Sequence, residues 1–256
     1  MSFGICNLSI VPLRLEPSDA SEMVNQLVFG EHFEVLEKTK KWSKIRLSFD
    51  NYEGYIDNKQ YEEISTEKHQ SLSNEKAIYA GELIDFITDN NHNLTTIPLG
   101  ARLPFFNDNK LHINDTSFIY EGKTNHEKLP KSALIDCAFL FINVPYLWGG
   151  KSPFGIDCSG LTQLCYRMGG ISIYRDASQQ ARQGELLSFP EEAKTGDLAF
   201  FDNEEGNITH AGIILDHQQI IHASGEVRID MLDNQGIFNR ETGKHSHQLR
   251  LIRSFM

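Results

Sequence analysis

Short runs in which apolar and polar residues alternate fill the first quarter of the chain. Val11, Leu13 and Leu15 alternate with other residues, and the run stops at the turn residues 16–19. Further runs, separated by polar turn residues, lie at 33–36, 42–49 and 55–56. A period of two predicts strands, and short strands with a turn after each are typical of a small barrel. We therefore expect an all-β domain over residues 1–64.

Residues 65–122 repeat this character more weakly. The segment 65–79 is polar and charged, which predicts a linker with some helical content. Beyond it, short strands are predicted at 99–104, 110–113 and 118–120. A strict internal repeat is not visible, so we expect the linker to be followed by a second, degenerate barrel.

The pattern changes from residue 123 onward. Apolar residues three and four positions apart predict one helix at 131–142 and another after Cys158. Strands are predicted later, at 209–215 and 219–223. Helices followed by strands indicate an α+β domain over residues 123–256.

The length and net charge of the chain limit the classes of protein to which it can belong. A chain of 256 residues exceeds the usual size of one domain, which agrees with two or three domains. The net charge of −11 argues against nucleic acid and anionic membrane surfaces as partners. No apolar run approaches the ~18 residues that span a bilayer. We expect a soluble monomer that binds neither nucleic acid nor membrane.

Cysteine usage and the amino terminus predict the compartment. The four cysteines, at positions 6, 137, 158 and 165, form no CxxC pair and no zinc-knuckle spacing. The first residues carry no basic region followed by an apolar run, so no signal peptide is predicted. We therefore expect a cytoplasmic protein without a metal or another cofactor.

Cys158 is the candidate nucleophile. It follows a loop rich in glycine and aromatic residues and precedes an apolar-periodic helix, so we expect its thiol in the first helical turn. The unpaired N–H groups and the positive dipole end of that turn favour a thiolate. We predict a depressed pKa for Cys158, helped by ion pairing with a histidine. Cys165, within the apolar stripe, is expected to be structural.

Two histidines in consecutive predicted strands favour a catalytic role for Cys158. One imidazole, His210, would take the thiol proton and return it to the leaving amine, and His222 would fix its tautomer. For both to lie on one face, His222 must pair with Gly212, which predicts a three-residue loop at 216–218 or a bulge. A zinc site of Cys158, His210 and His222 is the rival interpretation, although no carboxylate base lies close in sequence.

A series of short motifs extends this pattern over about half of the chain. In order they are Tyr-x-Trp-Gly-Gly (146–150), Asp-Cys-Ser-Gly-Leu (157–161), Arg-Asp-Ala-Ser-Gln-Gln (175–180), Gly-Asp-Leu-Ala-Phe-Phe (196–201), Thr-His-Ala-Gly-Ile (209–213) and Ile-His-Ala-Ser-Gly (221–225). The series is similar to the NlpC family of papain-like cysteine peptidases. The pattern at 13–15, 30–31, 42–45 and 54–56 resembles bacterial SH3-like domains.

This resemblance implies an α+β, papain-like NlpC catalytic domain preceded by one or two small all-β SH3-like barrels. It implies a thiol protease of murein recycling, a γ-D-glutamyl-L-diamino-acid endopeptidase. Such an enzyme cleaves peptidoglycan stem peptides with a free N-terminal L-Ala, before diaminopimelate or lysine. Cys158 would be the nucleophile, His210 the base and acid, and His222 the third member. The predicted substrate-binding residues are Tyr52, Tyr146, Asp157, Ser159 and Asp176.

Several of these roles have a chemical reason. The backbone N–H of Cys158 and the Tyr146 hydroxyl would stabilise an oxyanion. Asp157 would cap the helix or accept a hydrogen bond from the substrate's ammonium. Ser159 would donate to the glutamate α-carboxylate, with Arg175 as a counter-charge.

The barrels also have a predicted role. The first barrel, through Tyr52 in the turn at 50–54, would narrow the cleft and recognise the substrate's free amino terminus. Two other functions stay open, namely a hydrolase of intact cell wall and a non-catalytic wall-binding protein. The complete set of Cys158, His210 and His222 counts against the second, and the absence of a predicted signal peptide counts against the first.

Overall fold

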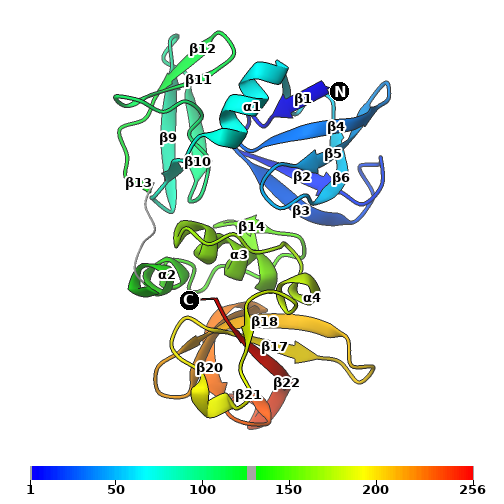
Figure 1. The fold of residues 1–256 in the computed structure, drawn as a ribbon, viewed down its shortest axis with the longest axis vertical. Coiled ribbons are helices and arrows are strands. Elements are labelled where there is room, and N and C mark those ends of the chain that lie inside the picture. The colour runs from blue at the N-terminus through cyan, green and yellow to red at the C-terminus, as the bar shows by residue number, and fades with distance from the viewer. Residues whose placement is uncertain (1, 126–130, 256) are drawn as a thin grey trace. The chain divides into compact units, whose positions relative to one another are not determined.

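The computed structural model describes residues 2–125 and 131–255, and the chain divides into two units (Figure 1). The first consists of Met1–Glu127 with Trp148–Pro153, and the second of Lys128–Leu147 with Phe154–Met256. Each unit has its own large sheet and apolar core. Within the described residues, no helix combines the length and apolar character needed to cross a bilayer.

The first unit begins with an antiparallel sheet in the order β3-β2-β6-β5-β4-β1-β7. Its strands are β1 (Ser2–Ile5), β2 (Ile10–Arg14), β3 (Met23–Val28), β4 (His32–Lys38), β5 (Trp42–Leu47), β6 (Glu53–Asp57) and β7 (Glu62–Ile64). The alternating apolar residues point to one face, where Val11, Leu13 and Ile45 are fully buried. The strands predicted in this region are confirmed, and β1, β3 and β7 add to them.

A smaller sheet, in the order β10-β9-β12-β11, follows in the first unit. The elements of this part are α1 (Thr66–Asn74), β8 (Tyr79–Ala80), β9 (Ile84–Asp89), β10 (Leu94–Pro98), β11 (Lys110–Ile113), β12 (Thr116–Ile119), β13 (Thr124–Asn125) and the later β14 (Lys151–Ser152). The predicted strand at 99–104 is wrong, because the chain turns there. Gly100 has a φ of +77°, and the Ala101 N–H donates to the Pro98 carbonyl at 3.0 Å.

The two sheets of the first unit share one apolar core. Ile5 from the first sheet and Phe29, which directly follows β3, lie in the same buried cluster as Ile87 and Phe118 from the second sheet. Helix α1, which lies in the segment predicted as a linker, adds Leu72 to this cluster. The second sheet is therefore packed as part of one unit, and the domain boundaries proposed from the sequence, at 64 and 122, stay predictions.

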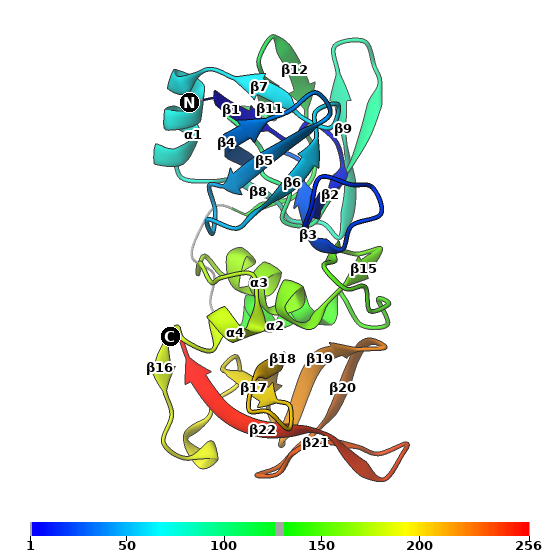
Figure 2. The same ribbon diagram turned by 90° about the vertical axis from the view of Figure 1, so that its right-hand side faces the viewer.

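The second unit combines helices with a sheet that closes on itself. The sheet runs β16-β22-β17-β18-β19-β20-β21, and β22 also pairs with β21, so β17 to β22 form a ring. Figure 2 shows β22, in red, curving beside β17 and β21. The elements are α2 (Lys131–Phe139), β15 (Gly155–Ile156), α3 (Cys158–Met168), α4 (Ala177–Gln180), β16 (Glu185–Leu186), η1 (Pro190–Glu192), β17 (Leu198–Asp202), β18 (Ile208–Leu215), β19 (Gln219–Ser224), β20 (Glu226–Leu232), β21 (Gly236–Asn239) and β22 (Lys244–Ser254). The predicted α+β class is confirmed.

Candidate active site

Cys158 is the first residue of helix α3, as predicted. Asp157 precedes it in an extended conformation and caps the helix, because its Oδ1 accepts a hydrogen bond from the Gly160 N–H at 2.7 Å. The Cys158 thiol is buried, and the backbone of Ala211 on the neighbouring strand β18 acts to lower its pKa. Since Ala211 follows His210 in the chain, the candidate nucleophile lies against the strand that carries the candidate base.

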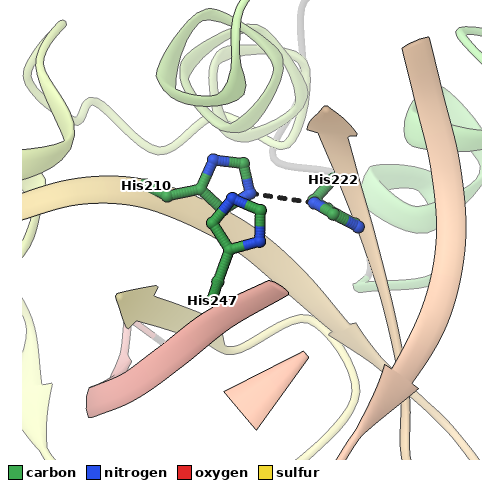
Figure 3. Close-up of side chains that lie close together, drawn as sticks. All are labelled: His210, His222 and His247. Atoms are coloured by element: carbon green, nitrogen blue, oxygen red, sulfur yellow. Dashed lines mark hydrogen bonds between the residues drawn. The ribbon is translucent and has the colours of Figure 1, made fainter. Parts of the chain in front are cut away.

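The hairpin of β18 and β19 brings the two predicted histidines together. The loop between the strands consists of residues 216–218, and Gly212 pairs with His222, so the predicted register is confirmed. Because side chains alternate along a strand, His210 lies on the same face as His222 and one diagonal step away. Their ring nitrogens, His210 Nε2 and His222 Nδ1, are 2.8 Å apart (Figure 3).

Beyond His222 lies a carboxylate that the sequence analysis missed. His222 Nε2 is 3.1 Å from Oδ2 of Asp230 on β20, and Arg228 Nε donates to the same oxygen at 2.9 Å. Burial raises the pKa of Asp230, but the hydrogen bonds from His222 and Arg228 together lower it by more than burial raises it. The pKa of Asp230 therefore lies below its usual range. Asp230 is therefore ionised at neutral pH and accepts a hydrogen bond from the Nε2–H of His222.

This chain of contacts fixes the tautomers of both imidazoles. With its Nε2 proton directed at Asp230, a neutral His222 has an unprotonated Nδ1, which accepts the Nε2–H of His210. The lone pair of His210 then lies on Nδ1, on the side of the ring away from His222 (Figure 3). Nδ1 is therefore the atom of His210 that can accept a proton.

The protonation of Cys158 and His210 differs from the prediction. Burial raises the pKa of the Cys158 thiol to about 12, and the charge of Asp157 adds to the rise, while the backbone of Ala211 opposes it. Burial lowers the pKa of His210 well below its ordinary value, and His247 lowers it further. Both groups are therefore neutral at pH 7. The predicted depressed thiol pKa is wrong, because desolvation outweighs the helix dipole.

A buried polar network surrounds the start of α3. Arg175 Nη1 donates to Asp157 Oδ1 at 2.9 Å and to Ser159 Oγ at 2.8 Å, and Arg175 Nη2 donates to Asp157 Oδ2 at 2.7 Å. The Ser159 hydroxyl donates to Asp157 Oδ1 at 3.3 Å. Asp157 thus serves as a helix cap paired with Arg175. The expected binding of substrate by Asp157 and Ser159 stays a prediction.

Arg175→Met is expected to destabilise the second unit by about 3–5 kcal/mol, because it leaves the Asp157 carboxylate buried without its cation. The side chains of Arg175 and Asp157 are 1% and 9% exposed. Arg250→Met is a matched control, since Arg250 is 63% exposed and lies 3.6 Å from Asp202, and we expect less than ~0.5 kcal/mol from it. Urea unfolding followed by circular dichroism measures both. Equal losses would contradict the structural role of Arg175.

The other three predicted site residues, Tyr146, Asp176 and Tyr52, belong to different segments of the chain. Tyr146 precedes α3 and forms a parallel bridge with Ile156, and burial raises the pKa of its hydroxyl. Asp176 is half-buried directly before α4. Tyr52 belongs to the first unit, where it packs against the buried apolar cluster of the first sheet. The binding roles of these three residues stay predictions.

Besides Asp230, the sequence analysis missed His247. It lies on β22, and its ring stacks on that of His210 with centroids 4.1 Å apart. A signal for Asp230 existed, because a tight turn at Gly225 pairs His222 with Arg228 and makes Asp230 a diagonal neighbour. His247 had no such local signal, because β22 reaches the site only when the sheet closes.

A buried cysteine at a helix start, packed against a strand whose histidine has a polar partner, defines a papain-like cysteine peptidase site. Comparison with known proteins agrees. The NlpC/P60 family matches residues 143–245, and the bacterial dipeptidyl-peptidase SH3 domain matches residues 13–60. The chain therefore carries an NlpC/P60 cysteine peptidase domain with an N-terminal bacterial SH3 domain, as the resemblance implied.

Relatives with known names match most of the chain. A gamma-D-glutamyl-L-lysine dipeptidyl-peptidase from Bacillus cereus is 26% identical over 255 residues, which cover 88% of this chain and 75% of that protein. Dipeptidyl-peptidase 6 from Lysinibacillus sphaericus is 26% identical over 87% of this chain and 89% of its own. The crystal structure of an NlpC/P60 family protein from Bacillus cereus shares the fold, with a TM-score of 0.83, 20% identity and 99% coverage of both chains.

Proposed function

We propose that the protein is a cysteine endopeptidase that cleaves the γ-D-glutamyl–L-diamino acid bond of peptidoglycan stem peptides. The observation that carries the proposal is the placement of Cys158 against the strand of His210, with His222 and Asp230 aligned behind it. The relative from Bacillus cereus, similar over 88% of this chain, is named for that bond when the diamino acid is lysine. The bond is an amide, which a thiol–imidazole site is suited to cleave.

Acylation starts from the neutral thiol–imidazole pair. His210 Nδ1 takes the thiol proton as the sulfur of Cys158 attacks the γ-carbonyl carbon, and the carbonyl oxygen becomes an oxyanion. The Cys158 backbone N–H at the helix start and the Tyr146 hydroxyl donate to that oxyanion. The C–N bond then breaks, His210 protonates the leaving amine, and a thioester remains on Cys158.

Deacylation repeats these roles with water. His210 Nδ1 takes a proton from the water that attacks the thioester, and returns it to the sulfur as the C–S bond breaks. In both half-reactions His210 carries a positive charge for a moment. His222 accepts its Nε2–H, and the ionised Asp230 behind His222 favours that charge, so the two residues position and stabilise the imidazolium.

We propose further that the substrate has a free N-terminal L-Ala. A dipeptidyl-peptidase releases a dipeptide from a free amino terminus, and both relatives carry that term in their names. Recognition of an ammonium requires hydrogen-bond acceptors, and an acylated terminus would leave buried acceptors unpaired at about 1–3 kcal/mol each. Tyr52 and Asp157 are the predicted contributors.

The free peptides L-Ala-γ-D-Glu-L-Lys and L-Ala-γ-D-Glu-diaminopimelate test this proposal. We expect cleavage at the γ-glutamyl bond, and at least ~100-fold lower kcat/KM for the N-acetylated peptides, which is about 2.7 kcal/mol at 1.36 kcal/mol per decade. Tyr52→Ala should reduce that preference, and Tyr55→Ala, in the same unit, should retain it. Equal turnover of free and acetylated peptides would contradict the amino-terminal requirement. Failure to cleave either would contradict the γ-glutamyl specificity.

A hydrolase of intact peptidoglycan is the second candidate, because the NlpC/P60 match at 143–245 defines the catalytic domain and leaves the size of the substrate open. Release of peptides from intact sacculi at a rate comparable to that for the free tripeptide would favour this alternative. The cytoplasmic location and the monomeric state expected from the sequence stay predictions.

A further inference from the structure

Three imidazoles meet at one place in the sheet of the second unit. They belong to His210 on β18, His222 on β19 and His247 on β22 (Figure 3). If one ring nitrogen is taken from each imidazole, the three nitrogens lie within 4.8 Å of one another. The peptidase mechanism uses His210 and His222, and it gives no role to His247.

The nitrogens that face one another can act as metal ligands. His210 Nε2 and His222 Nδ1, 2.8 Å apart, share one proton that an ion would displace. His247 Nδ1 is hydrogen-bonded to Ser246 Oγ at 2.9 Å, which leaves Nε2 as the ligand atom of His247. Nitrogens bound to one tetrahedral ion at about 2.05 Å lie about 3.3 Å apart. The three side chains must therefore move to bind one ion, and the ring of His247, which stacks on that of His210, must also rotate until its Nε2 points at the ion.

The surroundings select the class of ion. Imidazole nitrogen suits zinc, copper and nickel, whereas magnesium and calcium prefer oxygen ligands. Zn²⁺ accepts three histidines with a water molecule at the fourth position. Asp230, which accepts the second N–H of His222, supplies the carboxylate that orients a ligand histidine and raises its basicity.

We propose that His210, His222 and His247 form a reversible Zn²⁺ site whose occupation inhibits the peptidase. A neutral imidazole that binds metal through Nε2 carries its proton on Nδ1. Zinc-bound His210 therefore presents an N–H, and no longer a lone pair, at the atom that must accept the thiol proton. The inhibition, unlike the binding, rests on the proposed function. This ligand set differs from the zinc site considered from the sequence, because His247 replaces Cys158.

Binding is tested in a Cys158→Ala background, which removes the thiol as a competing ligand and removes turnover. Isothermal titration with Zn²⁺ should show one saturable site. Adding His247→Gln should weaken zinc binding at least ~10-fold. His245→Gln is the matched control on the same strand, since His245 bonds to Asp233 outside the cluster, and it should leave the affinity unchanged. Absence of a saturable site, or equal affinity in the two variants, would overturn the proposal.

Nuclear magnetic resonance of the Cys158→Ala protein tests the same site without His247→Gln, and so does not depend on the folding of that variant. In ¹⁵N-labelled Cys158→Ala protein, Zn²⁺ should shift the ring signals of His210, His222 and His247 and leave that of His245 in place. Shifts confined to other histidines would overturn the site.

Inhibition is measured separately on the protein with Cys158 intact. Saturating Zn²⁺ should reduce turnover at least ~10-fold, and EDTA should restore it. His247→Gln should raise the half-inhibitory zinc concentration at least ~10-fold relative to His245→Gln. Equal inhibition of both variants would place the inhibitory zinc on the thiol and overturn the inhibitory role. Lack of turnover before zinc is added would contradict the proposed function, but not the zinc site. The titration of Cys158→Ala would still show whether zinc binds to the three histidines.

Discussion

Cys158→Ala is expected to lower kcat for the γ-glutamyl peptide by at least about 10⁴-fold, because removal of a nucleophile leaves only the binding and oxyanion contributions of a peptidase site. Cys165→Ala is the matched control. Cys165 is buried in the same helix, and burial raises its pKa well above the ordinary value. We expect Cys165→Ala to retain activity. Turnover is followed by chromatography of the released dipeptide, and retained activity in Cys158→Ala would contradict the site.

The pH dependence of alkylation tests the state of the same thiol. With a pKa of about 12, the thiolate fraction of Cys158 rises tenfold per pH unit through the alkaline range. The rate of labelling by iodoacetamide should therefore increase steadily from pH 7 to pH 10. A rate that levels off below pH 8 would show an ion pair with His210 and restore the prediction made from the sequence.

The nucleophile and both histidines could be predicted because their signals are local. A glycine-rich loop before an apolar-periodic segment places Cys158 at a helix start. The register of His210 and His222 follows from counting residues across one hairpin, since side chains alternate along each strand. The strands of the first sheet were predicted for the same reason, because Val11 and Leu13 mark the buried face within a few residues.

What could not be predicted depends on contacts between distant segments. His247 reaches His210 only because β22 closes the sheet, and pairing across such distances leaves no periodic signal in the sequence. The raised thiol pKa has the same origin, because the burial of Cys158 is produced by packing and not by its neighbours in the chain. The apolar character of 99–104 misled the strand prediction, because the positive φ of Gly100 turns the chain there.

Substitutions along the line of hydrogen bonds from His210 to Asp230 should produce graded losses. His210→Asn removes the group that takes the proton from a neutral thiol, and we expect kcat to fall about 10³-fold or more. His222→Asn leaves an amide that can still accept the His210 N–H, so a loss of about 10–100-fold is expected. Asp230→Asn weakens only the orientation and the charge stabilisation of His222, and we expect about a tenfold loss.

His217→Asn is the matched control for this series. It makes the same histidine-to-asparagine change in the loop of the same hairpin, where His217 has a φ of 59°, a conformation that asparagine adopts readily. We expect unchanged kcat and an unchanged melting temperature. The position of each residue in the line of hydrogen bonds predicts the order of loss, because each step away from Cys158 removes a weaker influence on the His210 proton. A larger loss for Asp230→Asn than for His210→Asn, with both variants folded, would show that His210 Nδ1 is not the base.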